Sequence, residues 1–376
     1  MKKIVVSAVN LNVGGTLTIL RDCLSYLSEI SKNNEYEIIA IVYDKELAYY
    51  PNITYIENQW PKKRWVNRLW FEYVSLNRIS KEIGPVHLWL SLHDTTPNVV
   101  AERKAVYCHN PFPFHKWKWK ELAFAPKIVL FSLFSKYIYK KGISDNDYVI
   151  VQQAWIRNEF VRMFKLSEKR IIIALPNLPK LEEVNHFEDL TSNKTKFIYP
   201  ASPNTHKNFE CLCAATAILE EMTAEEFQVN ITLNGEENSY SKWLFRKWGH
   251  VKSLHWIGFV DRKELFHQYA QSDCLVFPSK VETWGLPITE FSIFNKMMLL
   301  SDLPYAKETA AGSQYVRYFD PNSAHELATM MLDVVKKRTD EFTEVKKINM
   351  EQPFVNNWND LFVKLLAKKD IFRLST

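Results

Sequence analysis

The chain has 376 residues, of which 47% are hydrophobic and 24% are charged. These fractions are close to the average of folded soluble proteins, which excludes a disordered or fibrous chain. The length exceeds what one hydrophobic core usually supports, so two domains are expected. The five cysteines form no C-x-x-C pair and are odd in number, which predicts reduced thiols and argues against a zinc site or a disulfide framework.

Charge is unevenly distributed along the chain. Residues up to Lys180 include 26 basic and 16 acidic side chains, and the remaining residues include 22 and 27. The basic first half is expected to face an anionic partner such as a membrane, a nucleic acid or a phosphate. We expect neither a secretory signal nor a membrane span, because no apolar run is long enough, and therefore expect a cytoplasmic protein.

Short β-branched and aromatic runs alternate with segments of helical periodicity, which is typical of parallel sheets with crossover helices. The first series of predicted strands comprises residues 3–8, 36–43, 86–92, 104–108, 128–131, 148–151 and 170–174. The second series comprises residues 197–201, 228–233, 254–257, 274–277, 297–300 and 315–319. The polar segment 176–193 between them contains two prolines and no glycine, which predicts a linker.

The predicted fold is therefore α/β, with two doubly wound, Rossmann-like parallel-sheet domains that face a central cleft. The N-terminal domain is predicted to span residues 1–180 and the C-terminal domain residues 181–355. Residues 356–376 are expected to form a helix that packs back across the domains. In such sheets ligands bind at the carboxyl ends of the strands, so the residues that directly follow strands are the candidates for function.

Gly14 and Gly15 follow the first predicted strand and precede a helix that ends near Ser31. Two glycines at a helix N-terminus let the backbone approach a phosphate or a sugar hydroxyl. An ordinary tight turn explains the same pair, and the full G-x-G-x-x-G dinucleotide fingerprint is absent.

Two histidines, His93 and His109, each follow a predicted strand. Both stand where a ligand-binding residue is expected, although a single histidine is more often a structural hydrogen-bonding group. No cluster of His, Asp and Glu has the spacing of metal ligands, so no metal site is predicted.

Lys207 lies in the loop between the strand that ends at Ala201 and a helix that begins near Phe209. Its ammonium group is suited to a diphosphate, together with the amides of the helix N-terminus. An exposed lysine at the start of a helix is the equally simple alternative.

The most informative segment runs from Glu282 to Glu290 and follows the predicted strand 274–277. With a helix that begins near Leu286 and has Pro287 in its first turn, Glu282 lies in the loop and Glu290 lies one turn inside the helix. One carboxylate is then placed for a sugar and the other for a ribose, while Gly285 leaves backbone amides open to an anion.

Together these features resemble glycosyltransferase family four, the large retaining group 1 with the GT-B double-Rossmann fold. Glu282 and Glu290 match the family's E-x7-E motif, which here follows a Phe-Pro-Ser strand end and contains Gly-Leu-Pro. The resemblance covers nearly the whole chain, because the other candidate residues appear in the family's order.

The resemblance implies a role for each of these residues. His109 and Glu282 are implied as the catalytic residues beside the transferred sugar, and Glu290 as the residue that binds the ribose hydroxyls. The remaining donor-binding residues, which meet the phosphates, the base and the acceptor, are Gly14, Gly15, Lys207, Gly258, Val260, Gly285 and Leu286.

The chain departs from the family at one position. The family usually has Gly-Arg at the end of the strand before the lysine, whereas this chain has Ala201-Ser202. The identity of the second phosphate-binding cation is therefore open, with His206 or an arginine elsewhere as candidates.

The activity that the resemblance implies is retaining, metal-independent hexosyl transfer without a cofactor. A UDP-, GDP- or dTDP-linked sugar is the implied donor, and a lipid-linked oligosaccharide of surface polysaccharide (O-antigen or capsule) biosynthesis is the expected acceptor. A transferase with a soluble acceptor, similar to glycogen or sucrose synthases, is the main alternative.

Two segments that combine tryptophan with basic residues favour a lipid-linked acceptor, because this composition suits an anionic membrane interface. We therefore expect the enzyme at the inner face of the cell membrane. A solvated helix face with core tryptophans is the simpler interpretation. Single-stranded nucleic acid also suits such segments, but it leaves the paired glutamates unexplained, so no nucleic-acid partner is expected. The segments contain Trp60, Lys62, Lys63, Arg64, Trp65, Lys116, Trp117, Lys118 and Trp119.

Overall fold

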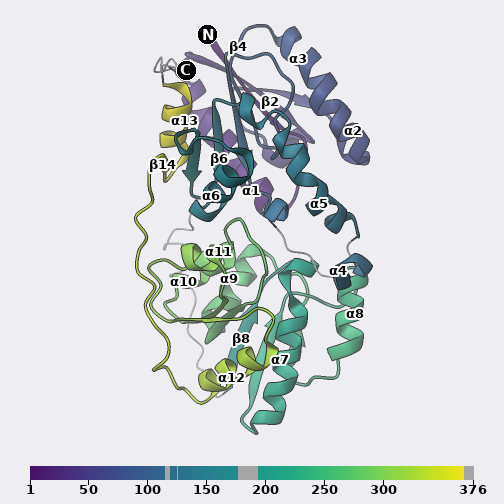
Figure 1. Ribbon diagram of the computed structural model, residues 1–376, viewed down its shortest axis with the longest axis vertical. Coiled ribbons are helices and arrows are strands. Elements are labelled where there is room, and N and C mark those ends of the chain that lie inside the picture. The colour runs from purple at the N-terminus through teal and green to yellow at the C-terminus, as the bar shows by residue number, and fades with distance from the viewer. Residues whose placement is uncertain (115–118, 125, 177–193, 368–376) are drawn as a thin grey trace. The chain divides into compact units, whose positions relative to one another are not determined.

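The computed structural model describes residues 1–114, 119–124, 126–176 and 194–367 (Figure 1). Its contacts divide the chain into two compact units, here called the first and second domains. The first comprises Met1–Asn110, Phe134–Asn177 and Met350–Thr376, and the second comprises Pro111–Leu133 and Leu178–Asn349. Sequence analysis divided the chain at residues 180 and 355, whereas the contacts group the last segment with the first domain.

The first domain contains an eight-stranded sheet in which every pair of neighbouring strands is parallel. The strand order is β14-β7-β6-β5-β4-β1-β2-β3. After β1 the chain continues to β2 and β3 on one side, and then crosses to β4 on the other. β1 and β4 therefore flank the topological switch point, where ligands bind in sheets of this type. The strands are β1 (Lys2–Ala8), β2 (Tyr36–Val42), β3 (Ile53–Glu57), β4 (Val86–Ser91), β5 (Arg103–Cys108), β6 (Tyr148–Val151), β7 (Ile171–Ala174) and β14 (Phe354–Val355).

Helices cover both faces of this sheet, as Figure 1 shows. The α-helices are α1 (Gly14–Ser31), α2 (Trp65–Trp70), α3 (Leu76–Ile83), α5 (Pro126–Lys140), α6 (Ala154–Phe164) and α13 (Trp358–Leu366). A π-helical turn, η3 (Phe71–Ser75), joins α2 to α3, and α5 begins in the second domain and ends in the first. The short 3-10 helices are η1 (Lys45–Ala48), η2 (Trp60–Lys63), η5 (Ile143–Asp145) and η6 (Glu168–Arg170).

The core of the first domain follows from the alternation of side chains along its strands. On β1, Ile4 and Val6 pack in one cluster with α1 and α13, whereas Val5 packs in a second cluster with η3 and α3. Both faces of β1 are thus apolar, as expected for a central parallel strand.

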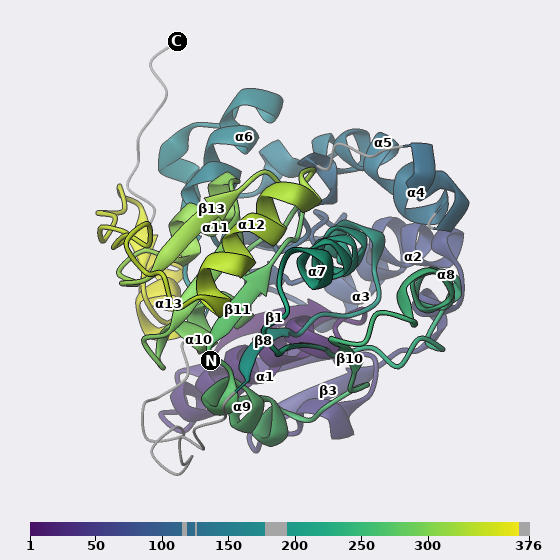
Figure 2. The same cartoon turned by 90° about the horizontal axis from the view of Figure 1, so that it is seen from below.

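The second domain contains a six-stranded parallel sheet of order β10-β9-β8-β11-β12-β13. The chain leaves β8 toward β9 and β10 and then returns to β11 on the other side, so β8 and β11 flank the switch point. Figure 2 shows α7 and α12 side by side, and the two helices are in contact.

The strands of the second domain are β8 (Thr195–Tyr199), β9 (Phe227–Ile231), β10 (Leu254–Trp256), β11 (Cys274–Phe277), β12 (Met297–Ser301) and β13 (Val316–Phe319). Its helices are α4 (Trp119–Phe124), α7 (Phe209–Met222), α8 (Ser239–Trp248), α9 (Arg262–Gln271), α10 (Leu286–Ser292), α11 (Pro304–Thr309) and α12 (Ala324–Val335), with short 3-10 turns η4 (Phe112–Phe114) and η8 (Thr205–Lys207).

The predicted strands are confirmed except for one. Residues 128–131 lie within α5, so the prediction of a strand there was wrong. A short apolar run does not distinguish a strand from a buried helical segment, and here the run lies within a helix of fifteen residues. β3 and β14 were not predicted. The predicted linker lies almost entirely outside the described residues.

Two further features of the described residues bear on function. No helix among them is both long and apolar enough to cross a bilayer. All five cysteines are buried and form no disulfide.

Candidate active site

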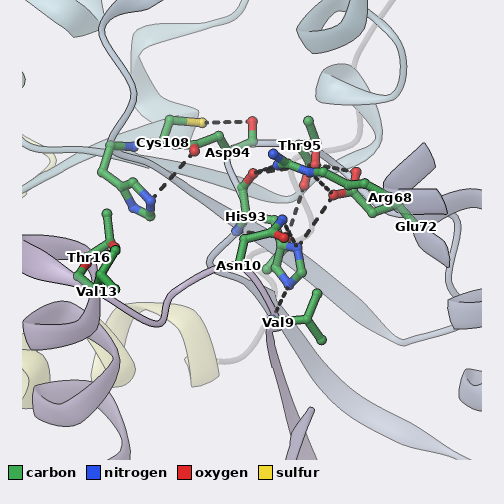
Figure 3. Close-up of polar contacts among 12 residues, drawn as sticks. Val9, Asn10, Val13, Thr16, Arg68, Glu72, His93, Asp94, Thr95 and Cys108 are labelled. Atoms are coloured by element: carbon green, nitrogen blue, oxygen red, sulfur yellow. Dashed lines mark hydrogen bonds and ion pairs between the residues drawn. The ribbon is translucent and has the colours of Figure 1, made fainter. Parts of the chain in front are cut away.

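The loops that follow β1 and β4 meet at the switch point of the first domain (Figure 3). The loop after β1 leads into α1 at Gly14, whose φ is +61°. A Cβ atom added to Gly14 meets nothing within 4 Å, so the backbone conformation and not close packing favours glycine here. Gly15 follows within the first turn of α1.

His93 connects these two loops. The Val9 backbone N–H donates to His93 Nε2 at 3.2 Å, so Nε2 is an acceptor and the proton of the neutral ring lies on Nδ1. His93 Nδ1 lies 3.5 Å from Glu72 Oε1 and 3.4 Å from the Asn10 side-chain amide. With an exposed fraction of 1%, His93 is a structural hydrogen-bonding group that positions the β1–α1 loop.

A buried ion pair lies beneath His93. Arg68 Nε is 2.8 Å from Glu72 Oε1, and Arg68 Nη2 donates to the His93 carbonyl at 2.7 Å. Thr95 Oγ1 donates to Glu72 Oε2 at 2.5 Å. Burial by itself raises the pKa of Glu72, but the charge of Arg68 and the hydrogen bond from His93 outweigh it and lower the pKa to about 2.

His109 follows β5 and is oriented by Asp94. The His109 backbone N–H donates to Asp94 Oδ1 at 2.7 Å, and His109 Nε2 lies 3.6 Å from Asp94 Oδ2. Burial lowers the pKa of His109, and the charge of Asp94 only partly offsets this effect. Its Nδ1 is buried and has no hydrogen-bond partner among the described residues. A neutral ring with an unsatisfied buried nitrogen is suited to accept or donate a hydrogen bond to a ligand.

Sequence analysis singled out His93 and His109 but not Asp94 or the Arg68–Glu72 pair. Asp94 has a φ of +68°, an uncommon conformation for a residue other than glycine and one that clusters at functional sites. In the sequence, the only feature that points to Asp94 is its position next to His93.

In the second domain, the switch point brings together Lys207 and Glu282. Lys207 follows β8, Glu282 follows β11, and these strands are neighbours in the sheet. Lys207 Nζ lies 2.5 Å from Glu282 Oε1, with exposed side-chain fractions of 17% and 11%. The predicted cation and the predicted sugar-binding carboxylate are therefore in direct contact.

Backbone-directed hydrogen bonds hold this pair in place. Tyr199 Oη donates to the Lys207 carbonyl at 2.7 Å. Asn208, at a φ of +59°, donates its side-chain amide to the carbonyls of Pro278 and Pro321 at 2.9 and 2.8 Å. These bonds tie the β8–α7 loop to the loop after β11, so the separation of Lys207 and Glu282 is set by the fold.

Glu290 lies on α10 and is buried, with an exposed fraction of 7%. Tyr269 Oη donates to Glu290 Oε2 at 3.2 Å, and Arg262 Nη2 lies 3.9 Å from Glu290 Oε1. Tyr269 and Arg262, both on α9, were not predicted as neighbours of this site.

The residues that are predicted to meet the donor in the second domain, other than Lys207 and the two glutamates, lie at the ends of loops. Gly285 precedes α10 with a φ of +89°, and Leu286 is the first residue of that helix, as predicted. Gly258 has a φ of +73° and lies between β10 and α9, with Val260 two residues later. Positive φ explains the use of glycine at both positions.

The missing arginine has two nearby basic candidates. His206 is buried, and its ring meets that of Phe112 edge-on at a centroid distance of 5.0 Å. Lys280 donates its backbone N–H to the His206 carbonyl at 2.8 Å, and its Nζ lies 3.3 Å from Glu210 Oε1.

Among the described residues, no group of three or more His, Cys, Asp or Glu side chains is arranged to hold a metal ion. The sequence contains one Asp-x-Asp triplet, Asp145-Asn146-Asp147, which directly precedes β6 and so lies at the amino end of that strand. Asp147 Oδ2 accepts the Lys104 backbone N–H at 3.0 Å. The triplet is structural and lies away from the switch point.

The first aromatic-basic segment is exposed in part. Trp60 and Trp65 have exposed fractions of 42% and 45%, and Lys63 and Arg64 are exposed. Lys62 instead turns toward the β1–α1 loop, where its ammonium contacts Asn12 and lies 5.5 Å from the Tyr43 ring centroid. In the second segment, Lys116, Trp117 and Lys118 lie outside the described residues, and Trp119 begins α4.

Comparisons with known proteins add the family and the fold that the chain is similar to. Residues 182–349 match the family model of glycosyl transferases group 1. No curated protein matches the sequence.

Similar solved structures span most of the chain. A sucrose-phosphate synthase from Thermosynechococcus elongatus is 14% identical with a TM-score of 0.65, and covers 90% of this chain and 92% of its own. The lipopolysaccharide outer core galactosyltransferase WaaB is 11% identical with a TM-score of 0.60. The match covers 98% of this chain and 100% of the WaaB chain. HepE of Anabaena, in complex with UDP and glucose, is 13% identical with a TM-score of 0.59. The match covers 90% of this chain and 92% of the HepE chain.

At this identity the similar structures establish the fold, which is GT-B with two parallel-sheet α/β domains. The family match covers the domain that contains Lys207, Glu282 and Glu290. The chain is therefore a glycosyltransferase whose residues 182–349 match the family model of group 1.

Proposed function

We propose that this enzyme transfers a hexose, with retention of configuration, from a nucleotide diphosphate sugar to a lipid-linked oligosaccharide of surface polysaccharide biosynthesis. The observation that carries the proposal is the contact between Lys207 and Glu282 at the switch point of the second domain, with the buried Glu290 on the following helix. A cation and two carboxylates match the three chemical parts of such a donor: diphosphate, sugar and ribose.

Lys207 supplies the positive charge in this proposal. Its ammonium has three N–H donors, so it is able to keep its contact with Glu282 while it binds a phosphate oxygen. Negative charge grows on the diphosphate as the glycosidic bond breaks, and a preorganised cation stabilises that charge. Glu282 then holds Lys207 in position before the donor arrives and contacts the sugar afterwards.

Glu290 is proposed to bind the ribose. A carboxylate has about four lone-pair sites, and the hydrogen bond from Tyr269 uses one of them. The ribose hydroxyls are proposed to donate to the same carboxylate. Gly258 and Val260 are proposed to contact the base, and the Gly285–Leu286 amides the phosphates.

From the first domain, His109 is proposed to contact the transferred sugar through its buried Nδ1. Gly14 and Gly15 are proposed to meet the donor phosphate and the acceptor. We propose that transfer needs neither a metal nor a cofactor, with His206 or Lys280 as the second cation beside Lys207. HepE, a structure with UDP and glucose bound, supports a nucleotide sugar as donor.

The lipid-linked acceptor and a position at the inner, cytoplasmic face of the cell membrane are supported by the basic first half of the chain and by the exposed Trp60, Lys63, Arg64 and Trp65. The similarity to WaaB, whose name describes a lipopolysaccharide transferase, is consistent with this acceptor class. The similarity to a sucrose-phosphate synthase favours a soluble acceptor as the second candidate. Transfer assays with membrane extracts and with free sugars and sugar phosphates separate the two.

The donor site is tested by thermal stabilisation with UDP, GDP and dTDP. Because a ligand that binds only the folded state stabilises it by about 2.7 kcal/mol at a concentration of 100 Kd, one nucleotide is expected to raise the melting temperature by several degrees. Lys207→Ala and Glu290→Ala are each expected to weaken binding about tenfold or more, through the loss of a charge-assisted hydrogen bond.

Lys242→Ala and Glu344→Ala are the matched controls, because both side chains are exposed in the same domain. They are expected to retain the full temperature shift. Stabilisation of wild type and all four variants to the same extent would place the nucleotide elsewhere, and no stabilisation by any nucleotide diphosphate would remove the main support for the proposed donor class.

A further inference from the structure

The helix formed by α2 and η3 buries Phe71 in the core but exposes three other apolar side chains, while it buries a charged one. Glu72 faces the protein interior with an exposed fraction of 1%, where it pairs with Arg68. The side chains of Val66, Trp70 and Val74 are instead exposed, with fractions of 73%, 58% and 46%. A surface helix of a globular protein normally has the reverse arrangement, with apolar residues inside and charges outside.

A second exposed apolar pair lies on the last turns of α5. Phe134 and Tyr137 have exposed fractions of 57% and 62%, whereas Ser135, between them, is fully buried. Lys141, directly after α5, holds its Nζ 4.3 Å from the ring centroid of Tyr73 in η3. The end of α5 therefore adjoins η3, and we call Val66, Trp70, Val74, Phe134 and Tyr137 together the outer face.

The grouping of these exposed apolar residues indicates a surface that binds a partner. Single exposed apolar residues are common, but grouped ones on neighbouring helices mark an interaction site. The outer face belongs to the first domain only, and it is separate from the switch-point loops, which contact the opposite side of α2 and η3 through Arg68 and Glu72.

Basic residues surround the outer face. Lys63 and Arg64 directly precede α2, and Lys136, Lys140 and Lys141 lie on or after the end of α5; all five are exposed. The sequence has no acidic residue from 58 to 71 or from 126 to 144, and the next one, Glu72, is neutralised by Arg68. The charged neighbours of the apolar residues in these two stretches of the sequence are thus all basic.

We propose that the outer face rests on an anionic lipid bilayer, with Val66, Trp70, Val74, Phe134 and Tyr137 in the interfacial layer. Tryptophan and tyrosine prefer this layer because their rings are amphipathic, and each basic residue adds attraction to anionic headgroups. The proposal extends the proposed function, since it names the surface through which the enzyme meets a lipid-linked acceptor. The helix on the membrane is then also the one that fixes the loops of His93 and Thr95.

The experiment is flotation of the full-length protein with vesicles of phosphatidylcholine alone, and of phosphatidylcholine mixed with an equal amount of phosphatidylglycerol. Wild type is expected to float with the anionic vesicles and to be released by high salt. The combined variant Val66→Ser, Trp70→Ser and Val74→Ser is expected to bind at least about tenfold more weakly, because three apolar side chains no longer enter the interface.

Lys63→Gln with Arg64→Gln is expected to weaken binding to anionic vesicles about tenfold or more, and to leave the weak binding to neutral vesicles unchanged. Val363→Ser is the matched control, since Val363 is a valine of α13 that is 61% exposed in the same domain but outside the outer face. This control is expected to float like wild type.

Each protein is also melted without ligand, which shows that it is folded, and then with UDP, GDP and dTDP. A failure of membrane binding is thereby distinguished from a failure of the proposed donor site. Flotation that is equal for wild type and the triple serine variant overturns the proposal, as does wild type that remains with neither vesicle. A third outcome also overturns the proposal: wild type self-associates and binds no vesicle, and the triple serine variant is a monomer. The outer face would then contact a second copy of the chain.

Discussion

Glu72 shows how one buried charge organises two loops at the switch point. Its carboxylate accepts from Arg68, faces His93 Nδ1 and accepts from Thr95 Oγ1. Ionised carboxylates are costly to bury unless each oxygen is paired, and here both oxygens have partners. The pair therefore acts as a positioning element for the loops after β1 and β4, and removal of one member leaves the other without compensation.

Glu72→Gln is expected to destabilise the first domain by about 3 kcal/mol in urea unfolding at neutral pH. Because the folded pKa of Glu72, about 2, lies below its unfolded value of about 4.3, this stabilisation is complete above about pH 5 and disappears as the pH falls toward 2. The stability difference between wild type and variant should close over that acidic range.

Glu82→Gln is the control for this prediction, because Arg78 and Glu82 have the same (i,i+4) spacing but side chains that are 82% and 59% exposed. Exposed pairs of this kind contribute about 0.5 kcal/mol or less. A Glu82 variant as destabilised as the Glu72 variant, or a Glu72 difference that persists to pH 2, would contradict the assigned role.

At the scale of single residues, sequence analysis identified those with a distinctive local context. Glu282 and Glu290 stand out by their spacing and by Gly-Leu-Pro between them, and Lys207 by its place after a strand. Asp94, Tyr269 and Asn208 carry no such signal, because their partners are 15 to 113 residues away in sequence. Their roles exist only once the loops meet.

At the scale of elements, α10 illustrates how one backbone conformation places two functional groups. Gly285 at a φ of +89° reverses the chain after the loop of Glu282, and α10 then carries Glu290 inward. Trp284 Nε1 donates to Thr289 Oγ1 at 2.8 Å, and Tyr305 Oη donates to the Ser279 carbonyl at 2.7 Å. The loop and the helix are therefore held as one unit.

Gly285→Ala is expected to destabilise the second domain by about 1–2 kcal/mol, because an alanine is strained at positive φ, and its Cβ would approach Ile288 Cδ1 to 3.3 Å. It is also expected to weaken nucleotide diphosphate binding, since Glu282 and Glu290 shift relative to each other. Calorimetric titration and urea unfolding measure the two effects.

Gly84→Ala is the matched substitution, with a φ of +88° at the end of α3 and no close contact with the added Cβ except Lys3 Nζ at 3.9 Å. It should destabilise the first domain at least as strongly, because its ψ of −156° lies in a region that essentially only glycine adopts, without a change in nucleotide affinity. Equal affinities for wild type and Gly285→Ala would show that the loop and α10 do not act as one unit.

At the scale of the whole molecule, the first domain is completed by the last described segment of the chain. β14 pairs with β7, and Leu361, Phe362 and Leu365 of α13 are buried in the same cluster as α1. Arg103 Nη1 donates to the Leu365 carbonyl at 2.8 Å. The segment is thus part of the core of the first domain.

Phe362→Ala is expected to destabilise the first domain by about 3–5 kcal/mol, because Phe362 is 1% exposed and its loss leaves a cavity. Val363→Ala, at the neighbouring exposed position, should change stability by about 0.5 kcal/mol or less. Urea unfolding followed by circular dichroism tests both, and similar losses for the two variants would refute the packing assigned to α13.

The sequence by itself determined the alternation of strands and helices, the start of α10 at Leu286, a helix near the end of the chain and the glycosyltransferase resemblance of Glu282 and Glu290. These depend on local periodicity, on proline and glycine, and on spacing within a few turns. Residues 128–131 were misassigned because a short apolar run is compatible with either kind of element.

Only the tertiary structure decided which of these local features come together. It placed Lys207 against Glu282, joined Arg68 and Glu72 to His93, and grouped β14 and α13 with the first domain. It also left Val66, Trp70 and Val74 exposed while it buried Glu72 of the same helix. The physical reason is that parallel sheets pair strands far apart in sequence, so the neighbours of a loop are set by strand order, which no local pattern encodes.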